Sequence, residues 1–195
     1  DHATCDSSIC VPLENGKCVS VRFPESAAPI SGDTPDPDKL EIARRLIAEF
    51  LGTLLLVFVV VGSGIMAQSL TEDEGVQLII NSLATVGGLY NLITILGPVS
   101  GCHINPVVSM VDVFNRDMTI HLFIEYVIVQ VAGGIAGALL ANTIFEYPFE
   151  LSEKSRFSYG LWISEIVATA FLILVIHGCI RTGQEKAVPG AVAML

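Results

Sequence analysis

The stretch of sequence that decides the fold is Ser100-Gly101-Cys102-His103-Ile104-Asn105-Pro106-Val107. It is polar and contains glycine and proline, yet it lies between long apolar runs. Lipid offers no hydrogen-bond partners, so irregular backbone at membrane depth survives only beside protein or a water-filled path. Asn105 followed by Pro106 predicts a helix start, because asparagine caps free N–H groups and proline takes a position that needs none.

The helix that begins there is expected to be short. It covers residues 106–113 and is therefore about 12 Å long, whereas the hydrocarbon core of a bilayer is about 30 Å thick. A half-helix that points its positive end into a membrane interior is an arrangement for handling solutes.

Composition also indicates a membrane protein. The chain is 52% hydrophobic and 15% charged, with a mean hydropathy of +0.65, whereas soluble domains carry about 25% charged residues. The net charge of −10 arises largely from the first forty residues and from short loops. It provides no basic face of the kind that binds nucleic acid.

Four apolar segments are long enough to span a bilayer: residues 46–67, 76–97, 119–145 and 157–180. A fifth begins near Ala187 and is still apolar at Leu195. A complete protein rarely ends inside a hydrophobic run, and this chain does not begin with Met. We therefore expect a fragment that is truncated after the start of the fifth span.

Residues 1–40 are expected to form a disordered tail, because they contain five prolines, several acidic residues and no helical periodicity. Cys5, Cys10 and Cys18 lie in this tail. They could form a disulfide or bind zinc, but no histidine stands at metal-site spacing. Reduced thiols are the simpler interpretation, and no metal site is predicted.

The distribution of basic residues predicts the orientation in the membrane, because positively charged loops stay in the cytoplasm. The first hairpin loop contains Glu72, Asp73 and Glu74, which places it outside. The segments before the first span and after the fourth contain Lys39, Arg44, Arg45, Arg181 and Lys186. The N-terminus is therefore expected to be cytoplasmic.

The first and fourth spans carry the same residues at one constant offset, in the pairs Glu49 and Glu165, Thr53 and Thr169, and Gly62 and Gly178. An odd number of spans per repeat inverts the second copy, as is common in transporters and channels. If the loop is repeated at the same distance along the sequence, a second Asn-Pro pair, equivalent to Asn105-Pro106, is expected beyond Leu195.

These features resemble the major intrinsic protein (aquaporin and aquaglyceroporin) family over residues 41–195. The resemblance rests on the loop 100–106, on Glu165, and on Ala48-Glu49-Phe50-Leu51-Gly52-Thr53 in the first span. It implies an all-α integral membrane fold, an inverted-repeat helical bundle in which two half-helices meet at mid-membrane. It further implies homotetramers with one pore per subunit, and passive conduction of water or small neutral solutes without a cofactor.

Three short segments look most like bacterial family members found beside arsenic-resistance genes: residues 61–66, 97–101 and 175–178. This similarity favours glycerol-like polyols or metalloid hydroxides as solutes besides water. Ion-coupled transport and a non-conducting truncated protein stay open as alternatives. No zinc-type histidine pair, nucleophile elbow or phosphate-binding loop in the sequence indicates an enzyme.

In the resembled fold, Asn105 donates its amide hydrogens to a solute at mid-pore. A row of acceptors along one wall comes from the backbone carbonyls of Gly101, Cys102, His103 and Ile104. The positive end of the helix that Pro106 opens would repel cations. Val107 stands where the family usually has alanine, and its extra methyl groups affect the width of the path.

Three further residues are candidates for the path or its support. Thr85 falls where the family places a constriction residue, and its small hydroxyl side chain suggests a wide, polar gate; helix packing is the alternative. His103 is expected to hold the loop by bonding to Glu165, while Glu49 does the same for the second loop. The rival interpretations are a pH-sensing histidine and glutamates that carry protons.

Overall fold

A computed structural model describes residues 8–12, 18–22, 37–148 and 157–195. The chain divides into two compact units, residues 1–37 and 38–195. In the first unit, β1 (Ser8–Pro12) and β2 (Cys18–Arg22) pair in antiparallel register, with Cys10 opposite Ser20.

The two strands differ from the disordered tail expected over residues 1–40. β2 reads Cys-Val-Ser-Val-Arg, in which valines alternate with other residues, and this pattern favours a strand. The helix α1 also begins earlier than expected, at Pro37, because proline is well suited to the first helical position. Cys5 lies outside the described residues.

The second unit is helical. Among the described residues, four helices are long and apolar enough to cross a membrane, as predicted: α1 (Pro37–Leu70), α2 (Glu74–Ser100), α4 (Ile120–Ile144) and α5 (Tyr159–Arg181). The short helix expected after Asn105 is α3 (Pro106–Asn115). The 3-10 turn η1 (Glu185–Ala187) leads into the fifth apolar segment, which forms α6 (Val188–Ala193).

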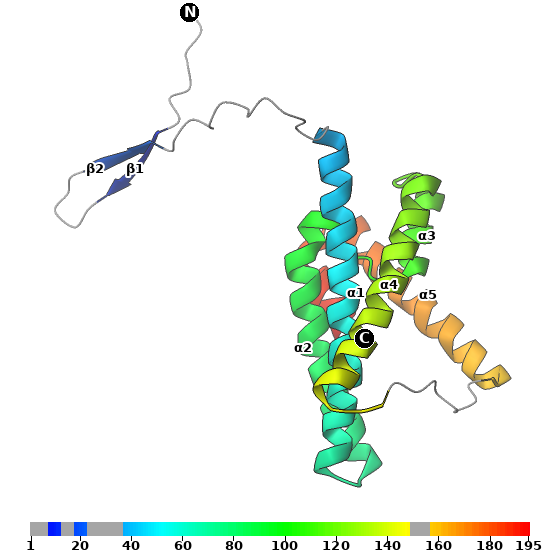
Figure 1. The fold of residues 1–195 in the computed structure, drawn as a ribbon. Helices are drawn as coiled ribbons and strands as arrows, with labels where there is room; N and C mark the ends of the chain where they lie inside the picture. The colour runs from blue at the N-terminus through cyan, green and yellow to red at the C-terminus, as the bar shows by residue number, and fades with distance from the viewer. Residues whose placement is uncertain (1–7, 13–17, 23–36, 149–156) are drawn as a thin grey trace, which may run out of the picture. The chain divides into compact units, whose positions relative to one another are not determined.

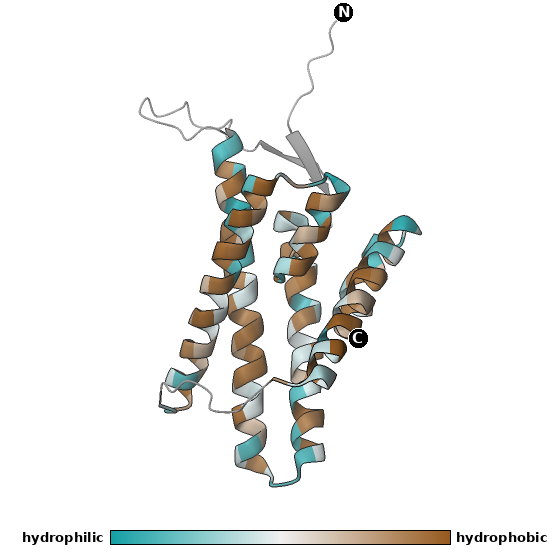
Figure 2. Ribbon diagram, turned by 90° about the vertical axis from the view of Figure 1, so that its right-hand side faces the viewer, coloured by the Kyte–Doolittle hydropathy of each residue, from teal (hydrophilic) through white to brown (hydrophobic). Residues whose placement is uncertain are grey.

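The helices of this unit form a bundle around α1. In Figure 1, α2 and α4 run close to α1, while α5 diverges from them toward its N-terminal end. The helix α6 packs against both α2 and α5. Apolar residues dominate the middle of the helices and hydrophilic residues their ends (Figure 2), which is the pattern expected of membrane-spanning elements.

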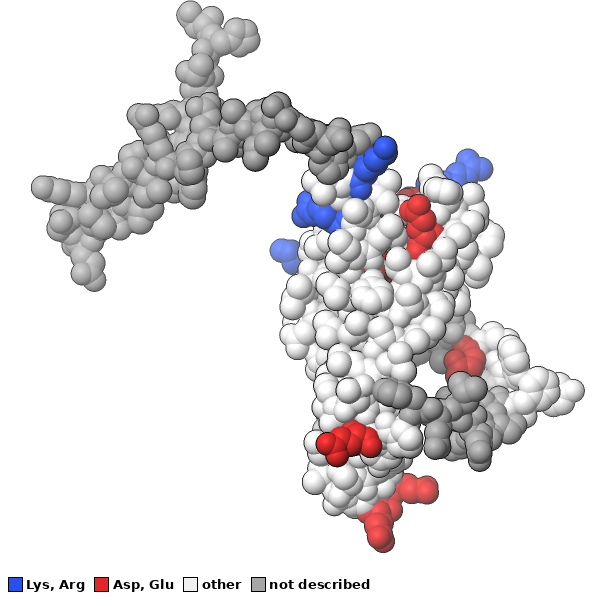
Figure 3. Space-filling view, in the orientation of Figure 1, with Lys and Arg blue, Asp and Glu red and all other residues white. Residues whose placement is uncertain are grey.

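Basic side chains gather at one end of the bundle, whereas acidic side chains lie at both ends. Figure 3 shows lysine and arginine side chains gathered where α1 begins, and acidic side chains at the turn between α1 and α2. The acidic turn includes Glu72 and Asp73, and Asp73 caps α2 by accepting from two backbone amides. The basic side chains at the start of α1 and the acidic turn between α1 and α2 are the charges from which the cytoplasmic N-terminus was predicted.

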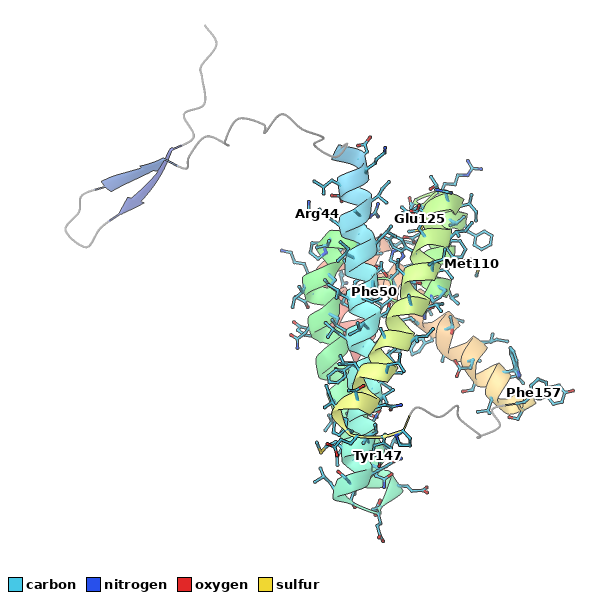
Figure 4. All side chains as sticks on the ribbon, viewed as in Figure 1. Arg44, Phe50, Met110, Glu125, Tyr147 and Phe157 are labelled. Atoms are coloured by element: carbon cyan, nitrogen blue, oxygen red, sulfur yellow. The ribbon has the colours of Figure 1, made fainter. Side chains whose placement is uncertain are left out.

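Two glycines of α4 bring it into contact with the backbone of α1. A Cβ atom on Gly133 would overlap the Phe50 carbonyl oxygen, and one on Gly137 would overlap the Leu54 carbonyl oxygen. Figure 4 labels Phe50 on α1, beside α4. Small residues allow this approach, and close packing replaces the hydrophobic driving force that helices lack in lipid.

Gly137→Ala is expected to lower the thermal midpoint of the complete protein in detergent. The added methyl group forces α4 away from α1 at a cost of about 1–3 kcal/mol, which corresponds to several degrees. Gly87→Ala on α2 is the matched control, because a Cβ there meets nothing within 4 Å. Equal midpoints for the two variants would contradict the close packing of α4 on α1.

Candidate functional site

The chain leaves α2 through a loop of unusual backbone conformation. Gly101 follows α2 with a φ of 91°, and Cys102 and Ile104 have φ values of 49° and 41°. The left-handed region is uncommon for residues other than glycine, and each such residue costs about 1–3 kcal/mol. Contacts from outside the loop must therefore hold it in this shape.

Those contacts come from Glu49 of α1, which is fully buried. Its Oε1 accepts hydrogen bonds from the Ser100 hydroxyl at 2.6 Å and from the His103 amide at 2.9 Å. Its Oε2 accepts from the Ile104 amide at 2.7 Å and from Gln130 Nε2 at 2.9 Å. A carboxylate tolerates burial when donors surround it in this way.

The loop conformation turns two neighbouring amides toward one carboxylate. Successive N–H groups in left-handed and related conformations form a concave site for an anion, and the Glu49 carboxylate occupies it. The carbonyl oxygens of residues 101–104 accept no hydrogen bond from any described residue. The loop therefore presents its amides to α1 and leaves its carbonyl acceptors available.

Side chains of α2, α3 and α4 complete the support of the loop. The Ser100 hydroxyl accepts from the Cys102 amide at 3.1 Å, and the Tyr126 hydroxyl donates to the Ser100 carbonyl at 2.9 Å. Gln130 Nε2 also donates to the Ser109 hydroxyl at 3.2 Å. Four helices therefore meet in one buried polar cluster.

His103 bonds to α3. Its Nδ1 lies 3.0 Å from the Ser109 hydroxyl, and its Nε2 lies 3.2 Å from the Asp112 carboxylate. These partners correct the expected pairing with Glu165, which is exposed on α5. They also correct the expected role of Glu49, which holds this loop rather than a second one, because it belongs to the same repeat and to an adjacent helix.

Asn105 caps α3. Its Oδ1 accepts from the Val107 amide at 2.8 Å, and Pro106 is the first residue of the helix. The Nδ2 group of the half-buried Asn105 donates to no described residue. One end of the side chain is thus used for capping, and the other keeps two N–H donors.

A cavity of about 660 Å³ lies beside the loop. It is lined by the loop residues from Gly101 to Asn105 and by Asp112 of α3. The rest of its wall is largely apolar and includes Leu56, Leu89, Phe171, Leu172, Ile176 and Val192. The residues that supply the Asn105 donors and the available carbonyl acceptors therefore line the same cavity.

Three candidate residues are not among the described residues that line this cavity. Pro106 is exposed and Val107 is half-buried. Thr85 is half-buried on α2, and its hydroxyl donates to the Asn81 carbonyl, one turn earlier, at 2.8 Å. A gating role for Thr85 stays a prediction.

The structure adds residues that sequence reasoning missed. Ser109 and Asp112 hold His103, and Thr169 and His177 of α5 line the cavity. Asp112 carried a signal, since an acidic residue in an apolar half-helix at membrane depth is rarely without function. Thr169 stands out in the sequence only as the repeat partner of Thr53, and His177 only as part of the segment 175–178. Neither pattern indicated a place in the cavity wall, because that place depends on how α5 packs.

The sequence of this chain matches one family model and several known proteins. The family model described as "Major intrinsic protein" matches residues 37–195. Aquaglyceroporin AqpS of Rhizobium meliloti (strain 1021) is 46% identical over 157 residues, which cover 80% of this chain and 67% of that protein. Probable aquaporin PIP2-7 of Oryza sativa subsp. japonica is 29% identical over 171 residues, 80% of this chain and 59% of the relative.

Aquaporin C of Dictyostelium discoideum is 31% identical over 142 residues, which cover 69% of this chain and 52% of that protein. The chain thus spans between about half and two thirds of the length of these curated relatives.

Glu49→Gln is expected to lower the thermal midpoint by several degrees. The glutamine side chain has one acceptor atom, so at least one buried donor loses its partner, at about 1–3 kcal/mol per group. Glu125→Gln on α4 is the matched control, because Glu125 is partly exposed and faces the exposed His121 at 3.5 Å. Similar midpoints for the two variants would show that the carboxylate does not hold the loop.

Proposed function

This chain belongs to the major intrinsic protein family, and on that premise we propose that it contributes to a passive transmembrane pore for water and small neutral solutes. The family consists of channels rather than enzymes, as the names of the aquaporin and aquaglyceroporin relatives indicate. The observation that carries the proposal is the re-entrant loop, whose Asn105 and flanking residues border the cavity.

The chemistry of this wall suits an uncharged hydrogen-bonding solute. The Nδ2 group of Asn105 supplies donors, and the carbonyls of residues 101–104 supply acceptors. A solute hydroxyl or a water molecule needs both kinds of partner to replace its lost hydration. The apolar side chains that make up most of the remaining wall offer no such partner, so the solute bonds chiefly along the loop.

The same arrangement disfavours ions. The N-terminus of α3 lies at Asn105, and the helix dipole gives that end a partial positive charge. Cations, including protons carried as hydronium, are repelled there. The apolar residues opposite the loop cannot replace the hydration shell of an ion.

The remaining features of the proposal concern the whole protein. We propose a homotetramer, as the family resemblance implies. We also propose a cytoplasmic N-terminus, because basic side chains gather where α1 begins (Figure 3). The similarity to an aquaglyceroporin at 46% identity favours glycerol-sized polyols besides water. The segments 61–66, 97–101 and 175–178 are the ground for proposing metalloid hydroxides as well. Glu165 would hold a second loop as Glu49 holds the first, since the two occupy matching positions in the repeat.

Proteoliposomes of the complete protein test the pore. We expect osmotic shrinkage faster than that of protein-free vesicles, with a low activation energy, for water and for glycerol. Permeability equal to bare lipid for both would refute the proposal, and saturable uptake that requires an ion gradient would favour coupled transport instead.

Asn105→Asp tests the role of the donors in that assay. The variant keeps the oxygen that caps α3 but replaces the amide hydrogens with a second carboxylate oxygen. We expect the permeability to water and glycerol to fall about tenfold, equivalent to about 1.4 kcal/mol, with little change in thermal midpoint because the cap survives. Unchanged permeability would mean that Asn105 only caps the helix.

A further inference from the structure

The helix α5 lays one stripe of side chains along the cavity. Thr169, Leu172, Ile176 and Ile180 recur every three or four residues, which puts them on one face of the helix. His177 lies beside this stripe and also lines the cavity. An imidazole thus interrupts a wall that is otherwise mostly apolar.

His177 makes no hydrogen bond or ion pair with any described residue, although it is half-buried. The described chain contains two other histidines, and both have partners: His103 has Ser109 and Asp112, and His121 has Glu125. A partly desolvated imidazole costs free energy unless something in the cavity bonds to it. Its two ring nitrogens offer one donor and one acceptor when the ring is neutral.

A second polar group enters the same cavity from α3. Asp112 has 26% of its side chain exposed, and one of its carboxylate oxygens bonds to His103. The other oxygen bonds to no described residue and is available as an acceptor. Asp112 lies seven residues after Asn105, or about 10 Å along the helix, so its unpaired oxygen is an acceptor separate from the Asn105 amide, although its other oxygen bonds to His103 of the loop.

The course of the chain puts His177 and Asp112 in the same half of the membrane. The helix α4 begins at the end where α3 stops, and α5 returns toward that end: Figure 4 labels Glu125 near the start of α4, and Tyr147 and Phe157 between α4 and α5 at the opposite end. His177 lies four residues before the end of α5, and Asp112 three before the end of α3.

We propose that His177 and Asp112 form a second hydrogen-bonding station, which selects uncharged polyols of about glycerol size as they pass between Asn105 and the end of the pore where α3 and α5 stop. The inference rests on the proposed function and deepens it by naming specificity residues outside the Asn-Pro loop. Adjacent hydroxyl groups of a polyol bond to the imidazole and the carboxylate, while its C–H groups contact Ile176 and Ile180. The carboxylate repels anions.

The test compares two substitutions of His177 in proteoliposomes of the complete protein, with glycerol and water permeability measured by light scattering. His177→Leu removes both hydrogen-bonding atoms and should lower the ratio of glycerol to water permeability about fivefold, the factor for one neutral hydrogen bond. His177→Gln keeps a donor and an acceptor and should retain most of the ratio. Asp112→Leu removes the free acceptor and should lower the ratio, whereas Asp112→Asn keeps an acceptor oxygen and should retain most of it. Because Asp112 also bonds to His103, the thermal midpoint of both variants is measured alongside, and a loss of ratio that only follows a lower midpoint would indicate a structural role.

His121→Leu is the matched control, because His121 is exposed and lies outside the cavity. It should leave the ratio unchanged. A His177→Leu ratio equal to that of the wild type overturns the inference, as do equal losses in His177→Leu and His177→Gln, which would indicate packing. If the wild-type protein conducts neither solute, the proposed function fails as well; a conducting wild type with unresponsive variants refutes this inference alone.

Discussion

The bonds from the Glu49 carboxylate to the amides of His103 and Ile104 are the interaction on which the rest of the structure depends. They join α1 to a loop that carries two non-glycine residues in the left-handed region. Without an internal acceptor, those amides would lie unpaired in a lipid environment, where each costs several kcal/mol. The buried carboxylate thereby makes an irregular segment compatible with membrane depth.

The same bonds create the polar side of the cavity. Because the amides of the loop are bound to α1, the carbonyls are left available, and Asn105 is fixed at the start of α3. Structural support and solute contact are therefore two sides of one peptide segment. Gln130 and Ser109 extend the support to His103 and hence to Asp112, so the buried cluster reaches the cavity wall.

Local signals made the spans, the short helix and the Asn105 cap predictable, because hydropathy and capping depend on neighbouring residues. The partner of the loop was not predictable in this way. Glu49 and Glu165 are equivalent in the repeat, and only the packing of α1 against the loop, across more than fifty residues, selects Glu49. The position of His177 in the cavity wall was likewise not predictable from the sequence, since it depends on how α5 is inclined against the other helices.

Amide hydrogen exchange of His103 and Ile104, resolved by NMR on the complete protein in lipid nanodiscs, tests the central claim most directly. Both amides are bonded to a buried carboxylate, so they should exchange as slowly as amides inside the membrane-spanning helices. Exchange at the rate of an open loop, in protein that is otherwise folded, would contradict the account, because Glu49 would then not be holding the segment.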